Sequence, residues 1–402
     1  MGTQAGTGYS EAADSRDAGV AAASQAMERA GASSCDLAIA LATTKHEPGP
    51  FVDGVRSVVG SAARIIGGSA VGTITNDRLG YGAYNTGVAV LSSDSIRFDV
   101  IDELMIDNAE HAAGQAVGKA MATADLPAEH NLLFLYDSIR VPAADGLRLN
   151  MGTWLVDGLG ESLGEWPPAA GVGLLGDMSF GLTSQWVDDR ILQQHVIALV
   201  TSGGVRMDTA IMHGCTPMGA YHTVTASDGP AVLEIDGRPA LQVIDEILGP
   251  AARAWEEYPL YLMLGVNRGD KFGPFQEADY ATRVCLNIDR DRQAVIMFEP
   301  DLRPGSEIQL MRSDVDVSYI DTQVSTLFDA LDGRTPVFAF YIDCAGRAKT
   351  YAGTDYEEAE ALQRALGDRV PLLGMYSGVE IAKVGPALQA LDLTGVLCLF
   401  SE

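Results

Sequence analysis

Internal repetition is the feature that most constrains how this chain can fold. The segment AVLSSDSIRFD at residues 89–99 matches ALVTSGGVRMD at 198–208 in an alanine, a serine, an arginine and the final aspartate. Each copy follows an apolar strand, a helix pattern and a strand interrupted by glycine. A third, weaker copy of this order closes the chain, and the three glycine-interrupted strands lie at 64–74, 171–177 and 374–381. Because such a repeat is too long for a solenoid, we interpret the copies as duplicated units, with chance similarity between apolar strands as the alternative.

The order of elements within each copy indicates the fold class. Strands that alternate with helices and hairpins are typical of an α/β (α+β) fold with mixed sheets, not of a purely parallel sheet. We expect one hairpin at 87–101 and a second at 196–211. The repetition predicts two lobes, with residues 37–211 forming a first lobe of duplicated strand–helix–hairpin units.

The chain divides into three predicted regions. Residues 1–16 are small and polar, and we expect them to be a mobile N-terminus. Residues 17–228 are expected to form an N-terminal domain, and residues 229–402 a C-terminal domain. The boundary between these two domains is placed at the polar turn Ser227-Asp228-Gly229.

Composition excludes several classes of protein. The chain of 402 residues has 27 Lys and Arg against 54 Asp and Glu, which gives a formal charge of −27. Such a surface repels nucleic acid and anionic membranes. No stretch offers the roughly 18 consecutive apolar residues of a membrane span, so no membrane insertion is expected. The five cysteines are scattered and never form C-x-x-C, which argues against disulfides and structural zinc and predicts a reducing, cytoplasmic compartment.

One short segment concentrates reactive side chains. The sequence HGCTPMGAYH at 213–222 holds two histidines and a cysteine among glycines and a proline. It leads into a predicted strand at 231–235, an Asp-Gly turn, and a helix at 240–248 that ends before Gly249. No catalytic motif follows from the chemistry of this segment alone.

Several segments, taken in order, resemble the FIST family of sensory domains. They are GCTPMG at 214–219, LEIDGRPAL at 233–241, CAGR at 344–347 and PLLGMYSGVEI at 371–381. Together they resemble both the N-terminal and the C-terminal halves of that module. The resemblance implies an intracellular signal-input protein that binds a small ligand, such as an amino acid or another metabolite, in a cleft between α/β units. Since no output domain fits in the chain, it also implies a separate signalling effector such as a kinase.

Two segments depart from the family pattern. Residues 67–72 are GGSAVG where the family often has Gly-Cys-Ser/Thr-x-x-Gly, so the cysteine is absent. The Gly-Glu pair near the C-terminus is split by a valine between Gly378 and Glu380. The missing cysteine supports a further alternative, a scaffold that has lost its ligand pocket.

We expect the glycine-interrupted strands and the reactive segment to converge on one ligand-binding cleft. Arg347 follows an apolar strand, and its guanidinium can form paired hydrogen bonds with a ligand carboxylate or with Glu380. The expected ligand-binding residues are Gly68, Ser69, Asp177, Cys215, Arg347 and Glu380.

A haem-binding nitric-oxide sensor is the alternative that the resemblance supplies. His213 is the haem-ligand candidate, with Cys215 and His222 beside it, since a neutral imidazole or a thiolate is a suitable donor to iron. Hydrogen bonding within a tight loop is the competing interpretation of these side chains. His46 follows the first strand, where α/β proteins place ligands, and a histidine of a surface loop is the alternative interpretation there.

A small-molecule hydrolase is the enzyme alternative. Ser69 and Lys45 suggest a Ser–Lys pair, and repeated units suit a site at their pseudo-symmetric centre. Cys344 lies close to Arg347 in the sequence, but no oriented base is near it, and a nucleophile needs one. We therefore expect a sensor rather than an enzyme and assign no catalytic residue.

Overall fold

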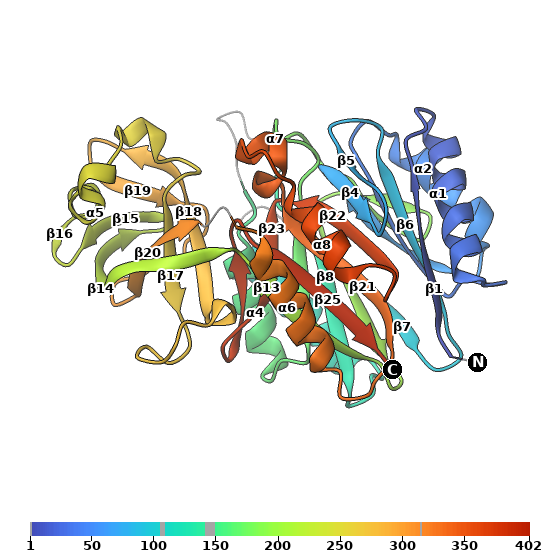
Figure 1. Ribbon diagram of the computed structural model, residues 1–402. Helices are drawn as coiled ribbons and strands as arrows, with labels where there is room; N and C mark the ends of the chain where they lie inside the picture. Colours follow the sequence, from blue (N-terminus) through green and yellow to red (C-terminus); the bar gives the residue numbers. More distant parts are fainter. Residues whose placement is uncertain (1, 105–108, 141–148, 314–315) are drawn as a thin grey trace.

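The computed structural model describes residues 2–104, 109–140, 149–313 and 316–402, and it contains two lobes (Figure 1). The larger lobe holds three similar α/β units. The smaller lobe is a separate sheet that is inserted into the third unit. The α/β class and the mixed sheets expected from the sequence are confirmed, and the third repeat belongs to the same lobe as the first two.

Each unit of the larger lobe has the same order of elements: strand, helix, strand, helix, strand, two-stranded hairpin and strand. The first unit consists of β1 (Gln4–Ser10), α1 (Ser15–Ala30), β2 (Leu37–Ala42), α2 (Pro48–Val59), β3 (Arg64–Ser69), β4 (Gly72–Thr75), β5 (Leu79–Tyr81) and β6 (Thr86–Ser92). The second consists of β7 (Arg97–Leu104), α3 (Glu110–Thr123), β8 (His130–Asp137), α4 (Gly152–Leu163), β9 (Ala169–Leu174), β10 (Gln185–Val187), β11 (Arg190–Leu192) and β12 (His195–Ser202). The third consists of β13 (Arg206–Met212), α6 (Ser318–Asp329), β21 (Pro336–Cys344), α8 (Glu358–Leu366), β22 (Leu372–Ser377), β23 (Val379–Val384), β24 (Ala387–Leu391) and β25 (Gly395–Ser401), with the turn η4 (Ala345–Arg347) and the short helix α7 (Lys349–Ala352) after β21.

The three units exchange their hairpins in a cycle. Strands β10 and β11 of the second unit extend the sheet of the first, whose order is β1-β6-β2-β3-β10-β11. In the same way β23 and β24 extend the second sheet beside β9, and β4 and β5 extend the third sheet beside β22. Each glycine-interrupted strand is therefore a crossing point, because the chain leaves one sheet there and enters the next. Gly378, for example, separates β22 from β23.

Two local predictions are corrected by this topology. The expected hairpins at 87–101 and 196–211 do not form, because β6 and β7 lie in different sheets, as do β12 and β13. The chain passes from one unit to the next at these positions, and each outer strand pairs instead with the last strand of its own unit. The N-terminus expected to be mobile contains β1, which pairs with β6, and the Thr3 amide donates to Glu402 Oε2 at 3.3 Å.

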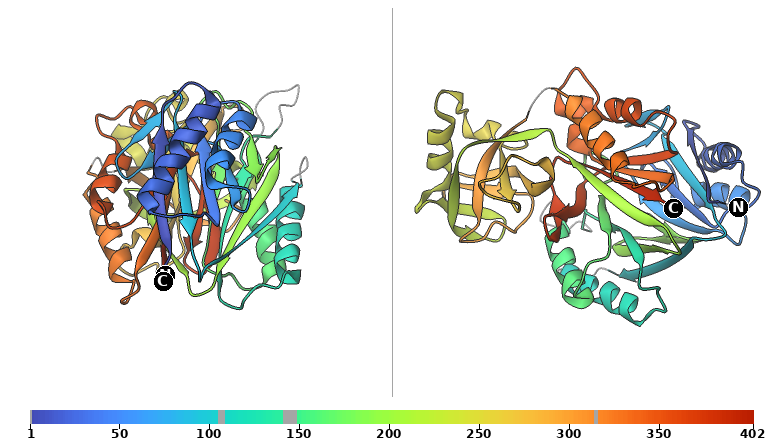
Figure 2. Two further views of the ribbon diagram at one scale, coloured as in Figure 1. Left: turned by 90° about the vertical axis from the view of Figure 1, so that its right-hand side faces the viewer. Right: turned by 60° about the horizontal axis from the view of Figure 1, so that its bottom comes forward.

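A pair of helices covers the outer face of each sheet. The two views of Figure 2 place the helices of the three units on different sides of the larger lobe. The strands beneath them read as continuous apolar runs; LAIALA in β2 is buried at all six positions. A strand covered on both faces needs apolar side chains at every position, which explains why these runs do not alternate with polar residues.

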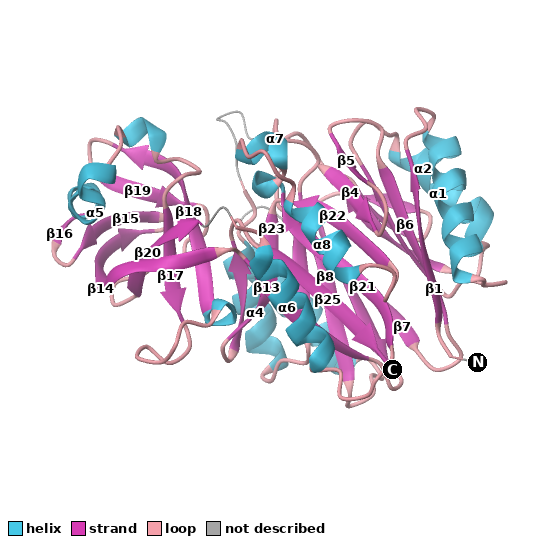
Figure 3. Cartoon of the chain, in the orientation of Figure 1, coloured by secondary structure: helices cyan, strands magenta, loops and turns pink. Residues whose placement is uncertain are grey.

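The smaller lobe lies between β13 and α6 in the sequence. Its strands, in the order β14-β20-β17-β18-β19-β15-β16, are antiparallel, and an additional pairing of β14 with β15 curls the sheet back on itself (Figure 3). The elements are β14 (Cys215–Asp228), β15 (Ala231–Ile235), β16 (Arg238–Pro239), α5 (Ala240–Leu248), η1 (Gly249–Ala251), η2 (Trp255–Glu257), β17 (Met263–Asn267), η3 (Glu277–Asp279), β18 (Tyr280–Asp289), β19 (Ala294–Met297) and β20 (Glu307–Ser313). Both sides of the boundary expected at residues 228 and 229 lie in this sheet.

Among the described helices, none combines the length and the apolar character needed to cross a membrane. All five cysteines are free thiols.

Candidate functional site

A cavity of about 630 Å³ lies between the two lobes. The smaller lobe contributes apolar side chains from β14, β17, β18 and β20, and the larger lobe contributes side chains from its second and third units. The apolar wall includes Ile139, Leu175, Met178, Phe180, Met218, Leu260, Met263, Val284, Leu286 and Met311. Concave, mostly apolar spaces of this size with a few polar groups are typical of small-molecule sites.

Arg347 is a buried cation of the cavity wall. It follows β21, and the single turn η4 directs its guanidinium back to Asp343, with Nε 3.0 Å from Oδ1. The other nitrogens donate to the Leu393 carbonyl at 3.0 Å, to the Tyr319 hydroxyl at 2.9 Å and to the Glu358 carboxylate. Burial lowers the pKa of Arg347, but Glu358, Tyr319 and Asp343 outweigh it and raise the pKa well above its ordinary value, so the side chain stays charged.

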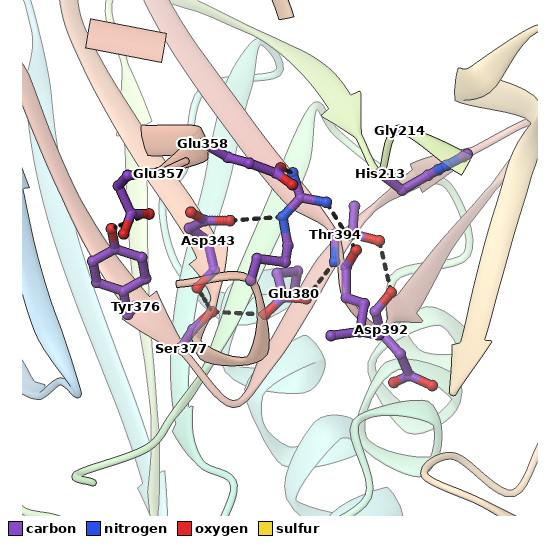
Figure 4. Close-up of polar contacts among 12 residues, drawn as sticks. His213, Gly214, Asp343, Glu357, Glu358, Tyr376, Ser377, Glu380, Asp392 and Thr394 are labelled. Atoms are coloured by element: carbon purple, nitrogen blue, oxygen red, sulfur yellow. Dashed lines mark hydrogen bonds and ion pairs between the residues drawn. The ribbon is translucent and has the colours of Figure 1, made fainter. Parts of the chain in front are cut away.

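The region around Asp343 and Glu358 holds further carboxyl groups, among them Glu380 and Asp392 (Figure 4). Burial raises the pKa of Asp343 to about 7, although Arg347 opposes it. Burial also raises the pKa of Asp392 to about 7 and that of Glu380 well above the usual range. The Ser377 hydroxyl donates to Glu380 at 2.7 Å, so Glu380 is held by its own strand crossing and does not pair with Arg347. The centre of the third unit thus holds more acids than bases.

Asp392 lies between β24 and β25, where the third unit meets the smaller lobe. Its Oδ2 accepts from the Val284 amide of β18 at 2.9 Å. Its Oδ1 has no hydrogen-bond partner among the described residues, although the side chain is only 4% exposed and lines the cavity. A buried carboxylate oxygen without a donor is unusual, since the large majority of buried polar atoms are paired.

His213 lines the cavity, and both of its ring nitrogens are used by the protein. The Cys215 amide donates to Nδ1 at 3.0 Å, so the hydrogen-bond network assigns the proton to Nε2, which donates to the Glu277 carbonyl at 3.2 Å. Burial lowers the pKa of His213, which keeps the ring neutral. Neither ring nitrogen is free to bind iron, so this histidine does not fit the role of a haem ligand.

The other histidines lie elsewhere. His222 Nδ1 is 2.7 Å from Asp236 Oδ2 on the surface of the smaller lobe. His46 is buried after β2, where its Nδ1 is 3.3 Å from the Ser15 hydroxyl. Neither lines the cavity.

The structure brings together only part of the expected site. Cys215, Arg347 and His213 line the cavity, whereas Gly68, Ser69, Asp177 and Glu380 lie outside its wall. Asp177 instead holds the turn that follows β9, accepting from the Ser179 amide at 2.9 Å.

The Ser–Lys pair considered for a hydrolase is not formed by the described residues. Ser69 is buried, and its Oγ accepts from the Ser184 amide at 3.0 Å. Lys45 is exposed in the loop after β2. Cys344 does line the cavity, but burial raises the pKa of its thiol well above the ordinary value, which disfavours the reactive thiolate.

Sequence reasoning missed Asp392 and the apolar wall. The segment ALDLTG around Asp392 carries no distinctive pattern. The methionines of the wall come from segments far apart in the sequence, and an apolar residue at a cavity has the same sequence signature as one in the core.

Proteins with similar sequences carry no assigned activity in their names. An uncharacterized protein of Mycobacterium tuberculosis (strain ATCC 25618 / H37Rv) is 27% identical over 213 residues, which are 51% of this chain and 55% of that protein. An uncharacterized protein of Methanocaldococcus jannaschii is 26% identical over 175 residues, which are 42% of this chain and 34% of that protein. This chain therefore spans about half the length of the mycobacterial relative and a third of the archaeal one.

Two solved structures resemble the whole chain weakly. A crystal structure of cyanuric acid hydrolase from A. caulinodans covers 99% of this chain and 98% of its own, with 12% identity and a TM-score of 0.37. A second structure of cyanuric acid hydrolase has 9% identity and a TM-score of 0.33, with complete coverage of both chains. Likeness at this level says nothing about the chemistry of this chain.

Family assignment rests on matches that cover most of the chain. The FIST N domain matches residues 36–238, and the FIST C domain matches residues 240–383. FIST domains are generally sensory domains for small ligands. The two matches follow each other in the order that the sequence segments indicated, and the chain belongs to the FIST family.

Proposed function

We propose that this FIST protein is a sensory protein whose small ligand, an amino acid or another metabolite, occupies the cavity between the two lobes. The observation that carries the proposal is the cavity itself, which measures about 630 Å³ and has walls from both lobes. A ligand that contacts both lobes stabilises the arrangement in which they enclose it. The cavity can therefore convert ligand concentration into a change of lobe arrangement.

The contacts between the lobes support such a change because many of them are polar. Arg283 of β18 donates to the Ala390 carbonyl at 2.8 Å, and Glu299 accepts from the Gly152 and Thr153 amides at 3.0 and 2.9 Å. Relative motion of two domains is the expectation unless their interface is large and hydrophobic. A separate effector such as a kinase would then respond to the arrangement of the lobes.

No observation on the described residues favours the haem sensor or the hydrolase over this function. His213 has no free nitrogen, and Ser69 has no lysine beside it. The proposal therefore concerns binding rather than catalysis.

A cavity-filling variant tests the proposed site. Leu286 on β18 is partly buried and lines the cavity, so Leu286→Trp places an indole where the ligand would lie. Thermal-shift screening of amino acids and other metabolites would find ligands, because a ligand at 100 times its Kd stabilises the native state by about 2.7 kcal/mol. We expect Leu286→Trp to weaken binding of each such ligand at least tenfold in calorimetry.

Ile288→Trp is the matched control. Ile288 lies on the same strand and is also partly buried, but it does not line the cavity. We expect this variant to bind as the wild type does. Equal affinity of wild type and a folded Leu286→Trp would show that the ligand binds elsewhere.

A further inference from the structure

The cavity wall does not offer a free cation at Arg347. A guanidinium has five N–H donors. Four contacts with protein acceptors already engage this one: Asp343 and Glu358 through their carboxylates, Tyr319 through its hydroxyl and Leu393 through its carbonyl. Two carboxylates face one guanidinium, so a carboxylate from a ligand would add a third negative charge to one positive charge. Like charges at close range oppose each other, and this site disfavours an anion.

Asp392 offers the complementary group. It is buried at the cavity wall, and its Oδ1 lacks a hydrogen-bond donor among the described residues. Arg283, the cation that acts on Asp392, is already occupied by Asp301, with nitrogen–oxygen distances of 2.6 Å for both Nε and Nη2. Two other buried acids that interact with Asp392 have donors of their own: Glu299 accepts from two amides of α4, and Glu380 accepts from the Ser377 hydroxyl. Asp392 Oδ1 is therefore a buried acceptor to which a ligand N–H can donate a hydrogen bond.

The apolar wall defines the rest of the ligand. Four methionines line the cavity, Met178 and Met218 on opposite lobes and Met263 and Met311 on neighbouring strands. Methionine is unbranched and polarizable, so a wall of this composition adapts its shape to different apolar bodies. Such a wall suits a hydrocarbon or aromatic body rather than a polar one.

Resting on the proposed function, we infer that the ligand of this cavity is an apolar molecule with a protonated amine, whose N–H donates to Asp392 Oδ1. Arg347 anchors the wall and does not bind a ligand carboxylate. The class thus includes aryl and alkyl amines and excludes carboxylates, so among the ligands of the proposed function it selects an amine metabolite rather than an amino acid.

Three probes with one body and different head groups test this inference: 4-phenylbutylamine, 4-phenylbutan-1-ol and 4-phenylbutanoate. Calorimetry at pH 8 would measure each against the wild type and Asp392→Asn. We expect the amine to bind at least tenfold more tightly than the carboxylate, because charge-assisted hydrogen bonds are the stronger ones. Asp392→Asn should lower the affinity for the amine roughly tenfold or more, and it should change the affinity for the alcohol by no more than about twofold.

The wild type provides a second test that needs no variant. Burial raises the pKa of Asp392 to about 7, and Arg283, Asp301, Glu299 and Glu380 are the charged groups that interact with it. An alkyl amine stays protonated well above neutral pH, so only the protein titrates in this range. Amine affinity should therefore rise several-fold from pH 6 to pH 8, whereas affinity for the alcohol should stay constant.

The outcomes separate the inference from the proposed function. Tightest binding by 4-phenylbutanoate, or an unchanged amine affinity in Asp392→Asn, would overturn the amine assignment. The amine assignment also fails if no probe binds while a metabolite from the screen binds the wild type and loses affinity in Leu286→Trp. In that case the cavity remains the ligand site. If Leu286→Trp changes the affinity of neither the probes nor any metabolite, both the amine assignment and the cavity as ligand site are wrong.

Discussion

Arg347 shows how a single residue can be placed correctly at a site and yet have a different role there. The sequence placed it after an apolar strand, where a charged group needs a partner, and the structure supplies four partners from the protein. Its expected partner Glu380 is bound to Ser377 instead. The local pattern shows that a partner is required, but a residue's partner in space comes from elements far away in the chain.

At this scale we predict that Arg347→Lys lowers the free energy of unfolding. Lysine keeps the charge but loses the planar fork, so it cannot serve Asp343, Glu358 and the Leu393 carbonyl together. The loss should be about 1.5–3 kcal/mol, the range for hydrogen bonds to charged groups, measured by urea denaturation.

Arg364→Lys is the control for this prediction. Arg364 lies exposed on α8, 3.9 Å from Glu360, and exposed pairs contribute about 0–1 kcal/mol. Unchanged stability of Arg347→Lys together with weaker binding of 4-phenylbutanoate would contradict a structural role for Arg347.

Helix pairs show at the element scale which contacts depend on the smallest side chain. Helices α3 and α4 touch through their backbones, and a Cβ on Gly158 would lie 1.9 Å from the His111 carbonyl oxygen. A Cβ on Gly114 would likewise lie 2.1 Å from the Leu155 carbonyl oxygen. We predict that Gly158→Ala destabilises the protein by about 1–3 kcal/mol, as overpacking does, although alanine favours a helix.

Ser24→Ala is the helical control. Ser24 is exposed in the interior of α1 and alanine has the higher helix propensity, so this change should leave the melting temperature equal or higher. Thermal unfolding of both variants measures the difference. An undiminished melting temperature in Gly158→Ala would show that α3 and α4 can separate without cost.

Elements with their own local signals were predicted well. The helix expected at 240–248 is α5, and the strand expected at 231–235 is β15. The glycine-interrupted strands were recognised, but those at 64–74 and 374–381 each belong to two sheets, and the one at 171–177 ends in a loop that leads to the next sheet. The sequence of a strand shows whether both of its faces are covered, and it does not show which strand lies beside it.

The buried acids affect the stability of the whole molecule. Burial raises the pKa of Asp137 to about 6 and the pKa values of Glu299 and Asp343 to about 7, above the values of an unfolded chain. The folded state therefore binds more protons than the unfolded state between about pH 4 and pH 7. Stability should fall as the pH rises through this interval.

Urea denaturation between pH 5 and pH 8 would measure that slope. A tenfold change in proton affinity corresponds to about 1.4 kcal/mol, so each such acid contributes on the order of 1 kcal/mol or more. Glu299→Gln should flatten the slope, whereas Glu360→Gln, on the exposed face of α8, should not. Stability that rises steadily from pH 5 to pH 8 would contradict the prediction.

The sequence by itself determined the repeated α/β units, the buried strands, the positions of many helices and the family. These features are local, since helix and strand periods and turn residues act over a few positions, and repetition makes each of them visible more than once. Only the tertiary structure decided that the units exchange hairpins, that β6 and β7 part into different sheets, and that Asp392 lines a cavity between the lobes. Those features depend on which surfaces from distant parts of the chain meet. Asp392 and Val284, for example, form a hydrogen bond in space, but nothing in the sequence indicates that they are in contact.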